Sequence, residues 1–245
     1  MLRASEKRIH LGQNLPEPEL LHRRSTARWY REYVLSLVPA AYWLCDEPSG
    51  LPADVAGSGL AMTGVNGSPT YSEAGPFTNP CIGYPSGAYH ERAVVSTRTN
   101  DMSVCMWVRR DGTPTNGGDI FTHGSTSGGF ALEYNSTGGL VRVNLPGVGT
   151  LGNIVAGSAG LNDLTWFFLF AGKATGAGGT WSAGWNGQLG SVGTGNPGTP
   201  TGNERLNGQA ATQTRLAHVA FFDRMLTQNE VSTLYQIGQK AVIPL

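Results

Sequence analysis

Two neighbouring carboxylates, Asp46 and Glu47, follow an apolar stretch and are the first residues to consider as catalytic groups. Retaining glycosidases need two carboxyl groups about 5–5.5 Å apart, one as acid and one as nucleophile. On a single strand, two side chains share a face only when they are two residues apart. Asp46 and Glu47 are adjacent, so a regular strand directs them to opposite faces. No Glu-x-Asp-x-x-Glu pattern occurs in the chain. The sequence therefore predicts a protein that is not an enzyme.

The histidines are scattered and suggest neither a metal site nor a catalytic triad. They are His10, His22, His90, His123 and His218. None has a second histidine or a carboxylate at the spacing of metal ligands, and no nucleophile and base are paired in a recognisable pattern. We therefore predict no metal centre among them. His218 is expected to line a strand face beside its apolar neighbours.

Sugar recognition is the binding chemistry for which the chain offers candidate residues. A sugar site combines an aromatic platform with amide or carboxylate hydrogen-bonding groups. Trp181, Trp185 and Asn186 lie beside a glycine-rich stretch and could supply both parts. The alternative is that both tryptophans belong to the core or to an interface. Three further tryptophans in apolar stretches are expected in the core: Trp43, Trp107 and Trp166.

The composition favours a domain made of many short strands. The chain of 245 residues contains 35 glycines and 14 prolines, and only 14% of its residues are charged. Single β-sandwiches reach this size. Seventeen basic and seventeen acidic residues balance, so no global charge draws the protein to nucleic acid or to an anionic membrane. The three cysteines cannot all pair with one another, and we expect Cys45 and Cys105 to be buried thiols in a reducing compartment.

Periodicity and turn residues place the expected elements. One amphipathic helix begins at Thr26 as N-cap and stops at Pro39, and a second opens with the capping box Thr227-Gln228-Asn229-Glu230 and nears its end at Gly238. Between them, runs of apolar residues bounded by turn signals predict strands. These strands span residues 40–45, 103–109, 120–123, 130–134, 140–145, 165–170, 182–185 and 216–222. Residues 171–181 and 190–213 are expected to be either long surface loops at one end of the sandwich or contact segments ordered by neighbours.

The two ends of this strand region carry a family resemblance. Tyr42-Trp43-Leu44-Cys45-Asp46-Glu47-Pro48-Ser49-Gly50 and Arg215–Leu226 resemble the first and last strand motifs of the laminin-G-like, concanavalin A-like jelly rolls. Met102–Gly112 is similar to the second strong strand of that family. The resemblance covers about residues 40–238 and implies an all-β jelly-roll sandwich. It implies no particular function, because this fold hosts lectins, glycosidases, adhesion modules and structural domains.

Calcium is the one cofactor that the resemblance keeps open. Relatives of this fold often hold calcium with loop carboxylates and carbonyls, and Asp54 aligns with an aspartate frequent after the opening motif. The alternative is that Asp54 caps local backbone amides, as aspartates in turns commonly do. We predict no required cofactor and name no second calcium ligand.

The N-terminal region differs from the rest and suggests a docking role. Residues 1–25 are charged, contain Pro16 and Pro18, and resemble neither a signal peptide nor a packed element. We expect residues 1–38 to form an extended arm and helix that docks onto a partner, and residues 39–245 to form the jelly roll; the alternative is an arm folded back on its own domain. The predicted docking residues are Arg3, Lys7, Arg8, Arg23, Arg24, Arg28 and Trp29.

This layout is similar to that of minor tail and surface proteins of tailed bacteriophages. The resemblance implies a non-enzymatic virion protein, assembled in the host cytoplasm without export and present in several copies. Its partners would be other virion proteins and a host surface glycan, with no nucleic acid and no membrane insertion. The alternatives are a capsid decoration protein of the same layout and a free cellular carbohydrate-binding lectin module.

Overall fold

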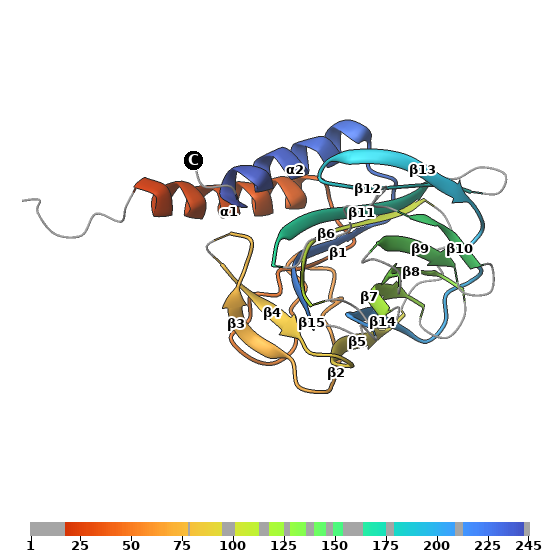
Figure 1. Cartoon of the computed structure of the whole chain (residues 1–245), viewed down its shortest axis with the longest axis horizontal. Helices are drawn as coiled ribbons and strands as arrows, with labels where there is room; N and C mark the ends of the chain where they lie inside the picture. The colour runs from red at the N-terminus through yellow and green to blue at the C-terminus, as the bar shows by residue number, and fades with distance from the viewer. Residues whose placement is uncertain are drawn as a thin grey trace, which may run out of the picture.

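The chain forms a β-sandwich of two antiparallel sheets with two helices on one side (Figure 1). The computed structural model describes residues 18–77, 79–94, 101–112, 118–124, 128–135, 140–145, 149–153, 164–174, 179–208 and 213–242. This confirms the predicted all-β jelly-roll class with one short helix near each end.

The larger sheet has eight strands. In spatial order they are β13 (Gln188–Thr194), β12 (Thr180–Trp185), β11 (Trp166–Ala174), β6 (Met102–Asp111), β15 (Gln213–Phe222), β4 (Pro80–Tyr84) and β3 (Thr70–Ala74), and β1 (Ala41–Trp43) also pairs with β15. Ala41 lies opposite Phe221 and Trp43 opposite Val219. The opening and closing motifs of the sequence are therefore hydrogen-bonded neighbours.

The smaller sheet has seven strands. Their order is β10 (Gly149–Asn153), β9 (Val141–Leu145), β8 (Phe130–Tyr134), β7 (Gly118–His123), β14 (Asn203–Leu206), β5 (Tyr89–Ala93) and β2 (Gly64–Asn66). The first core lies between the two sheets. Side chains from both contribute to it, among them Trp43, Phe121, Leu132, Val143 and Phe221.

A second core lies on the other side of the eight-stranded sheet, beneath α1 (Pro18–Ser36) and α2 (Gln228–Val242). Tyr30 and Val34 of α1 are fully buried there, together with Trp107 of β6. This arrangement explains why β6 is apolar on both faces: one face meets the smaller sheet and the other meets the helices. The molecule thus has three layers. Residues on both sides of the predicted domain boundary between residues 38 and 39 contribute to this second core.

The N-terminal helix is longer than predicted. It begins at Pro18 rather than at Thr26, and its first turns extend past the sandwich (Figure 1). Proline is well accepted in the first turn of a helix, and Glu, Leu and Arg, which follow it, are good helix formers. The prediction relied on an apolar stripe, which residues 18–25 do not show in the sequence. Helix propensity therefore outweighed the missing periodicity.

The two expected long loops contain strands. Residues 171–174 continue β11, and residues 180–181 begin β12, so much of the first predicted loop is a β-hairpin. The second contains most of β13 and all of β14. Glycine and threonine dominate both segments and hide their strand pattern. Both segments are nevertheless held by cross-strand pairing and by a few buried side chains, among them Trp181 and Leu206.

The second helix begins as its capping box predicts. The Glu230 carboxylate accepts hydrogen bonds from the Thr227 amide and hydroxyl at 2.8 and 3.0 Å. Gly238, however, does not end the helix, which continues to Val242. A Cβ at Gly238 would lie 2.3 Å from Cζ2 of the Trp107 ring. This glycine therefore serves the close approach of α2 to the eight-stranded sheet.

Glu230 also links the helix to the preceding turn, and its loss should weaken the protein in a pH-dependent way. Arg224 donates two hydrogen bonds to it at 2.7 and 2.9 Å, and these lower the pKa of Glu230 to about 2. A lowered pKa stabilises the fold above the unfolded-state value of about 4.3. We expect Glu230→Gln to lower the free energy of unfolding by about 1–2 kcal/mol at pH 7. This difference from the wild type should shrink as the pH falls from about 4 toward 2.

Urea unfolding of the wild type and Glu230→Gln at several pH values measures this effect. Glu32→Gln is the control, because its partner Arg28 is 77% exposed and their ion pair contributes little. A Glu230→Gln cost that does not change between pH 7 and pH 3 would contradict the role of the Glu230 carboxylate.

Candidate functional site

The outer face of the seven-stranded sheet is the side of the sandwich on which neither helix packs. The helices α1 and α2 cover the outer face of the other sheet, and neither of them packs on this one (Figure 1). Side chains alternate between the two faces of a strand, so the register of β5, β14 and β7 divides their residues. Arg92, Glu204 and His123 face the core, whereas Glu91, Arg205 and Thr122 face outward.

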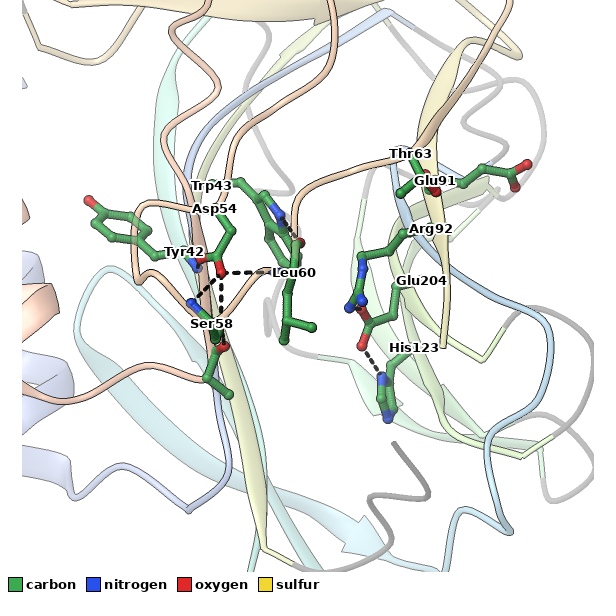
Figure 2. A network of polar contacts seen from close by, with 11 residues as sticks. Tyr42, Trp43, Asp54, Ser58, Leu60, Thr63, Glu91, Arg92, His123 and Glu204 are labelled. Atoms are coloured by element: carbon green, nitrogen blue, oxygen red, sulfur yellow. Dashed lines mark hydrogen bonds and ion pairs between the residues drawn. The ribbon is translucent and has the colours of Figure 1, made fainter. Parts of the chain in front are cut away.

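The inward set forms a buried ionic network between the sheets (Figure 2). Glu204 accepts a hydrogen bond from Nη1 of Arg92 at 2.8 Å and another from Nδ1 of His123 at 2.9 Å. Burial alone would raise the pKa of Glu204, but the hydrogen bonds and charges of His123 and Arg92 outweigh it and lower the pKa. The His123 ring packs 5.0 Å from that of Phe221 on the opposite sheet. This network is therefore part of the core rather than a surface site.

The first outward cluster joins β5 and β14. Glu91, which points away from Arg92 in Figure 2, accepts hydrogen bonds from Asn203 at 2.7 Å and from Arg205 at 2.9 Å. The Arg205 guanidinium also lies over the Tyr89 ring, 4.6 Å from its centre. These contacts fix an arginine, an amide and an aromatic ring side by side on the outer face.

The second outward cluster joins β7, β8 and β9. Asp119 lies opposite Glu133, and Glu133 lies opposite Arg142, to which it is bonded. Asp119 accepts a hydrogen bond from Thr122 at 3.2 Å. Burial raises the pKa of Asp119 to about 6, and the neighbouring charge of Glu133 adds to this effect. The cluster therefore contains one carboxylate held by an arginine and one carboxyl group that titrates near neutral pH.

Together the two clusters make a face suited to polar, uncharged ligands. Carboxylates accept hydrogen bonds, arginines and Asn203 donate them, and the side chains are already oriented by their contacts with one another. Most of them are only partly exposed, and Glu133 is just 8% exposed, so the face is preorganised. Such alternating donors and acceptors beside the Tyr89 ring fit the hydroxyl groups and apolar ring faces of a sugar.

Trp181 is not available as a sugar platform. It is fully buried in the inter-sheet core, where its ring packs 5.1 Å from Phe130. Its indole N–H donates to the Gly195 carbonyl at 3.0 Å. The prediction of a sugar contact is therefore wrong for this residue, and the alternative of a core tryptophan is correct. Trp181 lies on β12, and it shares the inward face of that strand with Ala183.

Trp185 and Asn186 have structural contacts of their own. Trp185 is partly exposed and packs 5.8 Å from Phe167. Asn186 and Gly187 form the two-residue turn between β12 and β13, with φ values of 49° and 81°. The Asn186 side-chain oxygen accepts a hydrogen bond from the Phe168 amide at 3.1 Å. Both residues belong to the eight-stranded sheet, so they do not join the polar face.

Asp46 and Glu47 do not converge on a common site. Asp46 accepts a hydrogen bond from Asn79 at 3.3 Å, whereas Glu47 accepts one from the Ala53 amide at 2.8 Å. Burial raises the pKa of Glu47. They hold two different loops, which agrees with their expected placement on opposite sides of the chain.

Both carboxylate oxygens of Asp54 accept hydrogen bonds from nearby groups of the same region of the chain (Figure 2). One oxygen accepts from the amides of Tyr42 and Ala56, and the other accepts from the Ser58 amide and hydroxyl and from the Leu60 amide. Burial alone would raise its pKa, but these hydrogen bonds lower it. Within the described ranges, no group of three His, Cys, Asp or Glu side chains could hold a metal ion. The capping role is therefore the one observed.

Replacing Asp54 should destabilise the loop and leave calcium without effect. Asp54→Asn keeps the shape but turns one acceptor oxygen into a donor that faces the Ser58 and Leu60 amides. We expect a loss of about 2 kcal/mol in the free energy of unfolding. Thermal unfolding with and without millimolar calcium measures both points. A calcium-dependent rise in the melting temperature of the wild type that disappears in Asp54→Asn would instead show an ion site.

The predicted docking residues fall partly within the described chain. Arg3, Lys7 and Arg8 lie outside it, and Arg23 and Arg24 belong to α1. Arg28 and Trp29 are exposed residues of α1: the Arg28 side chain is 77% exposed and Trp29 is 56% exposed. They remain candidates for contact with a partner. In the described part of the chain, no helix is long and apolar enough to cross a membrane.

Two antiparallel sheets in this order, one of them with a polar outer face, define a lectin-like jelly-roll domain. The chain belongs to the concanavalin A-like lectin/glucanase superfamily, whose laminin-G-like family model matches residues 85–232, more than half of the chain. The match includes the closing motif and most of the polar face but not the opening motif at Tyr42. A sequence search of curated proteins finds no significant match.

Solved structures with a similar fold are larger than this chain. The binding domain of botulinum neurotoxin DC, solved with rat synaptotagmin II, has a TM-score of 0.66 and 14% identity over 84% of this chain and 52% of its own. A structure of botulinum neurotoxin type C, whose cell entry depends on two ganglioside molecules, has a TM-score of 0.64 and 13% identity, with 84% and 53% covered. Trypanosoma rangeli sialidase has a TM-score of 0.61 and 14% identity, with 89% and 39% covered. The chain thus spans about half the length of the first two, and the likeness is one of fold.

Proposed function

We propose that this chain is a non-enzymatic structural protein of a tailed-bacteriophage virion, a minor tail or tail-tip component that presents a glycan-binding face. The observation that carries the proposal is the division of the molecule into two sides. The helix layer with exposed Trp29 lies on one side, and the preorganised polar face lies on the other (Figure 1). A particle protein must be held on one side while its opposite side meets the host surface. A capsid decoration protein would use the same arrangement.

The docking side is supported by α1. Its C-terminal half is anchored in the helix core by Tyr30 and Val34, while its first turns project beyond the sandwich. Residues 1–17 precede this projection and carry Arg3, Lys7 and Arg8. A helix fixed at one end can present such a segment to a neighbouring virion protein without loss of the folded domain.

Removal of residues 1–17 should abolish incorporation into particles, because it takes away the arm and leaves every described element in place. The measurement is the amount of the protein in purified particles from cells that express the truncated chain. Trp29→Ala should reduce incorporation, and Trp185→Ala, a change on another surface, should not. Normal incorporation of the truncated chain would refute docking through the arm and favour a free cellular lectin module.

Glycan binding is supported by the chemistry of the outer face of the seven-stranded sheet and agrees with the ganglioside dependence of one fold neighbour. The ganglioside-dependent neurotoxin shares the fold, which makes the sandwich a suitable scaffold for this role. We expect Arg205→Ala to abolish binding to a glycan array, because it removes donor groups and the support of Tyr89. Screening soluble wild-type protein and this variant on the same array tests the assignment.

Glycoside hydrolysis is a second candidate that one observation favours. Asp119 and Glu133 are cross-strand neighbours, and such pairs hold their Cβ atoms about 4.5–5.5 Å apart. Burial raises the pKa of Asp119 to about 6, and a carboxyl group with such a raised pKa beside a second carboxyl group is a pattern seen in acid and nucleophile pairs. If the chain is an enzyme, glycans that bind will be cleaved, and Asp119→Asn will abolish cleavage while binding persists. The proposed non-enzymatic role predicts that bound glycans are recovered intact.

A further inference from the structure

A small cavity of about 200 Å³ lies between α1 and the helix-covered face of the eight-stranded sheet. It is on the opposite side of the sandwich from the polar face. Its lining consists of Ala27, Arg28 and Arg31 from α1, Asn79 from the turn before β4, and His218 from β15. Three of these five side chains carry positive charge or can gain it, and one is an amide. That is an unusual lining next to an apolar core.

His218 is held at this cavity by a strained backbone. Its φ is 53°, which side-chain-bearing residues seldom adopt, and it lies where the register of β15 against β6 shifts between Ala217 and Ala220. The bulge places the imidazole among rings on the helix side, 5.2 Å from Tyr30 and 4.8 Å from Phe77. Residues held in such backbone conformations gather at functional sites, because they cost about 1–3 kcal/mol each.

The imidazole is oriented by one partner. The Tyr42 hydroxyl and Nδ1 of His218 are 2.6 Å apart in the buried layer. When the hydroxyl donates to Nδ1, the hydrogen of the neutral ring is on Nε2. Nε2 is then a donor with no partner in the described structure, and it belongs to a ring that lines the cavity. Burial, followed by the charge of Arg31, lowers the pKa of His218 to about 3, so the ring stays neutral near pH 7.

The two arginines set the charge of the cavity. Arg28 and Arg31 are three residues apart on α1, which places them on one side of the helix. Arg28 uses its Nε for Glu32 at 2.7 Å, which leaves its terminal nitrogens available. Asn79 donates a 3.3 Å hydrogen bond to the carboxylate of Asp46, which does not line the cavity. Two arginines, an asparagine and the neutral ring of His218 therefore line the same small volume.

We propose that this cavity binds a single small oxyanion, either a phosphate group or a sugar carboxylate. Guanidinium groups bind both with paired hydrogen bonds, and a partly enclosed volume strengthens these bonds relative to water. The cavity is large enough for one such group and too small for an oligosaccharide. Binding there would also tie α1 to β15, two elements separated by almost the whole chain. The inference is independent of glycan binding at the polar face.

Calorimetric titration of the full chain at pH 7 and low ionic strength tests the site. The ligands are inorganic phosphate, glucuronate and glucose, the last as a neutral sugar of similar ring. We expect saturable binding of phosphate or of glucuronate, and none of glucose. Whichever of phosphate and glucuronate binds more tightly identifies the source of the anion. Arg31→Gln should weaken binding by about tenfold, which corresponds to the loss of one charge-assisted hydrogen bond.

Matched variants separate binding from folding. Arg28 and Arg31 are exposed at the cavity rim, so their replacement leaves the core intact. Glu32→Gln should tighten binding, because it frees Arg28 and removes a negative charge. Trp29→Ala, on the same helix but outside the cavity, should leave binding unchanged. The proposal is overturned if neither anion binds saturably, or if the Arg28→Gln/Arg31→Gln double variant binds them as the wild type does.

Discussion

Glu204→Ala should destabilise the protein by about 3–5 kcal/mol, because it leaves Arg92 and His123 buried without their shared carboxylate. The side chains of Arg92 and Glu204 are only 6% and 4% exposed, so water cannot replace the lost partner without opening the sandwich. Chemical unfolding monitored by tryptophan fluorescence gives the free energy directly. We expect the variant to be partly unfolded at 37 °C.

The pH dependence of this effect has a defined sign. The pKa of Glu204 is lowered in the folded state, so its contribution is fully present above the unfolded value of about 4.3 and is lost as the pH falls below it. The difference between wild type and variant should therefore narrow in acid. Glu91→Ala is the matched control on the opposite face of the same strand pair, and about 1 kcal/mol is expected for the Glu91–Arg205 pair, whose side chains are 27% and 20% exposed. Equal costs for the two replacements would contradict a buried ionic network.

Gly238→Val should lower the free energy of unfolding by about 3 kcal/mol, because a larger side chain there overpacks the interface between α2 and the eight-stranded sheet and forces the two apart. Any Cβ at this position meets the Trp107 ring at 2.3 Å, and Trp107 is itself 1% exposed and enclosed by Phe77 and Phe168. Neither the ring nor the helix backbone has room to move alone. The helix layer would have to shift as a unit, with exposure of the second core.

Gly190→Val is the control for this change. Gly190 lies in β13, and nothing is within 4 Å of the position that its Cβ would occupy. Because valine favours strands, its effect should stay within about 1 kcal/mol. Thermal unfolding of both variants decides the point. If Gly238→Val melts at the wild-type temperature, α2 does not pack against Trp107 in the way described.

Apolar patterning predicted the parts of the fold that pack on both sides. The segments 103–109 and 216–222 are buried on two faces, so their sequences are apolar throughout, and they became β6 and β15. The short strands β2, β3, β5 and β14 were missed because their alternation is polar or interrupted by glycine. Their place in the sheets is fixed by partners distant in the sequence. No local pattern can reveal such pairing.

The candidate site was missed for a related reason. A search for carboxylate pairs on one strand compares residues two positions apart, whereas Asp119 and Glu133 become neighbours only through the pairing of β7 with β8. Arg205 and Glu91 likewise meet across β14 and β5. The aromatic candidate Trp181 failed because an isolated tryptophan gives no indication of which strand face it occupies. One signal was available: the single charged residues Glu133 and Arg142 on strands that are otherwise mostly apolar.

The most direct test of the account is glycan binding by the outer face of the seven-stranded sheet. The wild-type chain, Arg205→Ala and the control Trp185→Ala are screened on one glycan array, and the best ligand is titrated against all three. We expect the wild type and Trp185→Ala to bind the glycan. Arg205→Ala should keep its fold but lose glycan binding. Absence of any glycan ligand, or equal binding by Arg205→Ala, would contradict it.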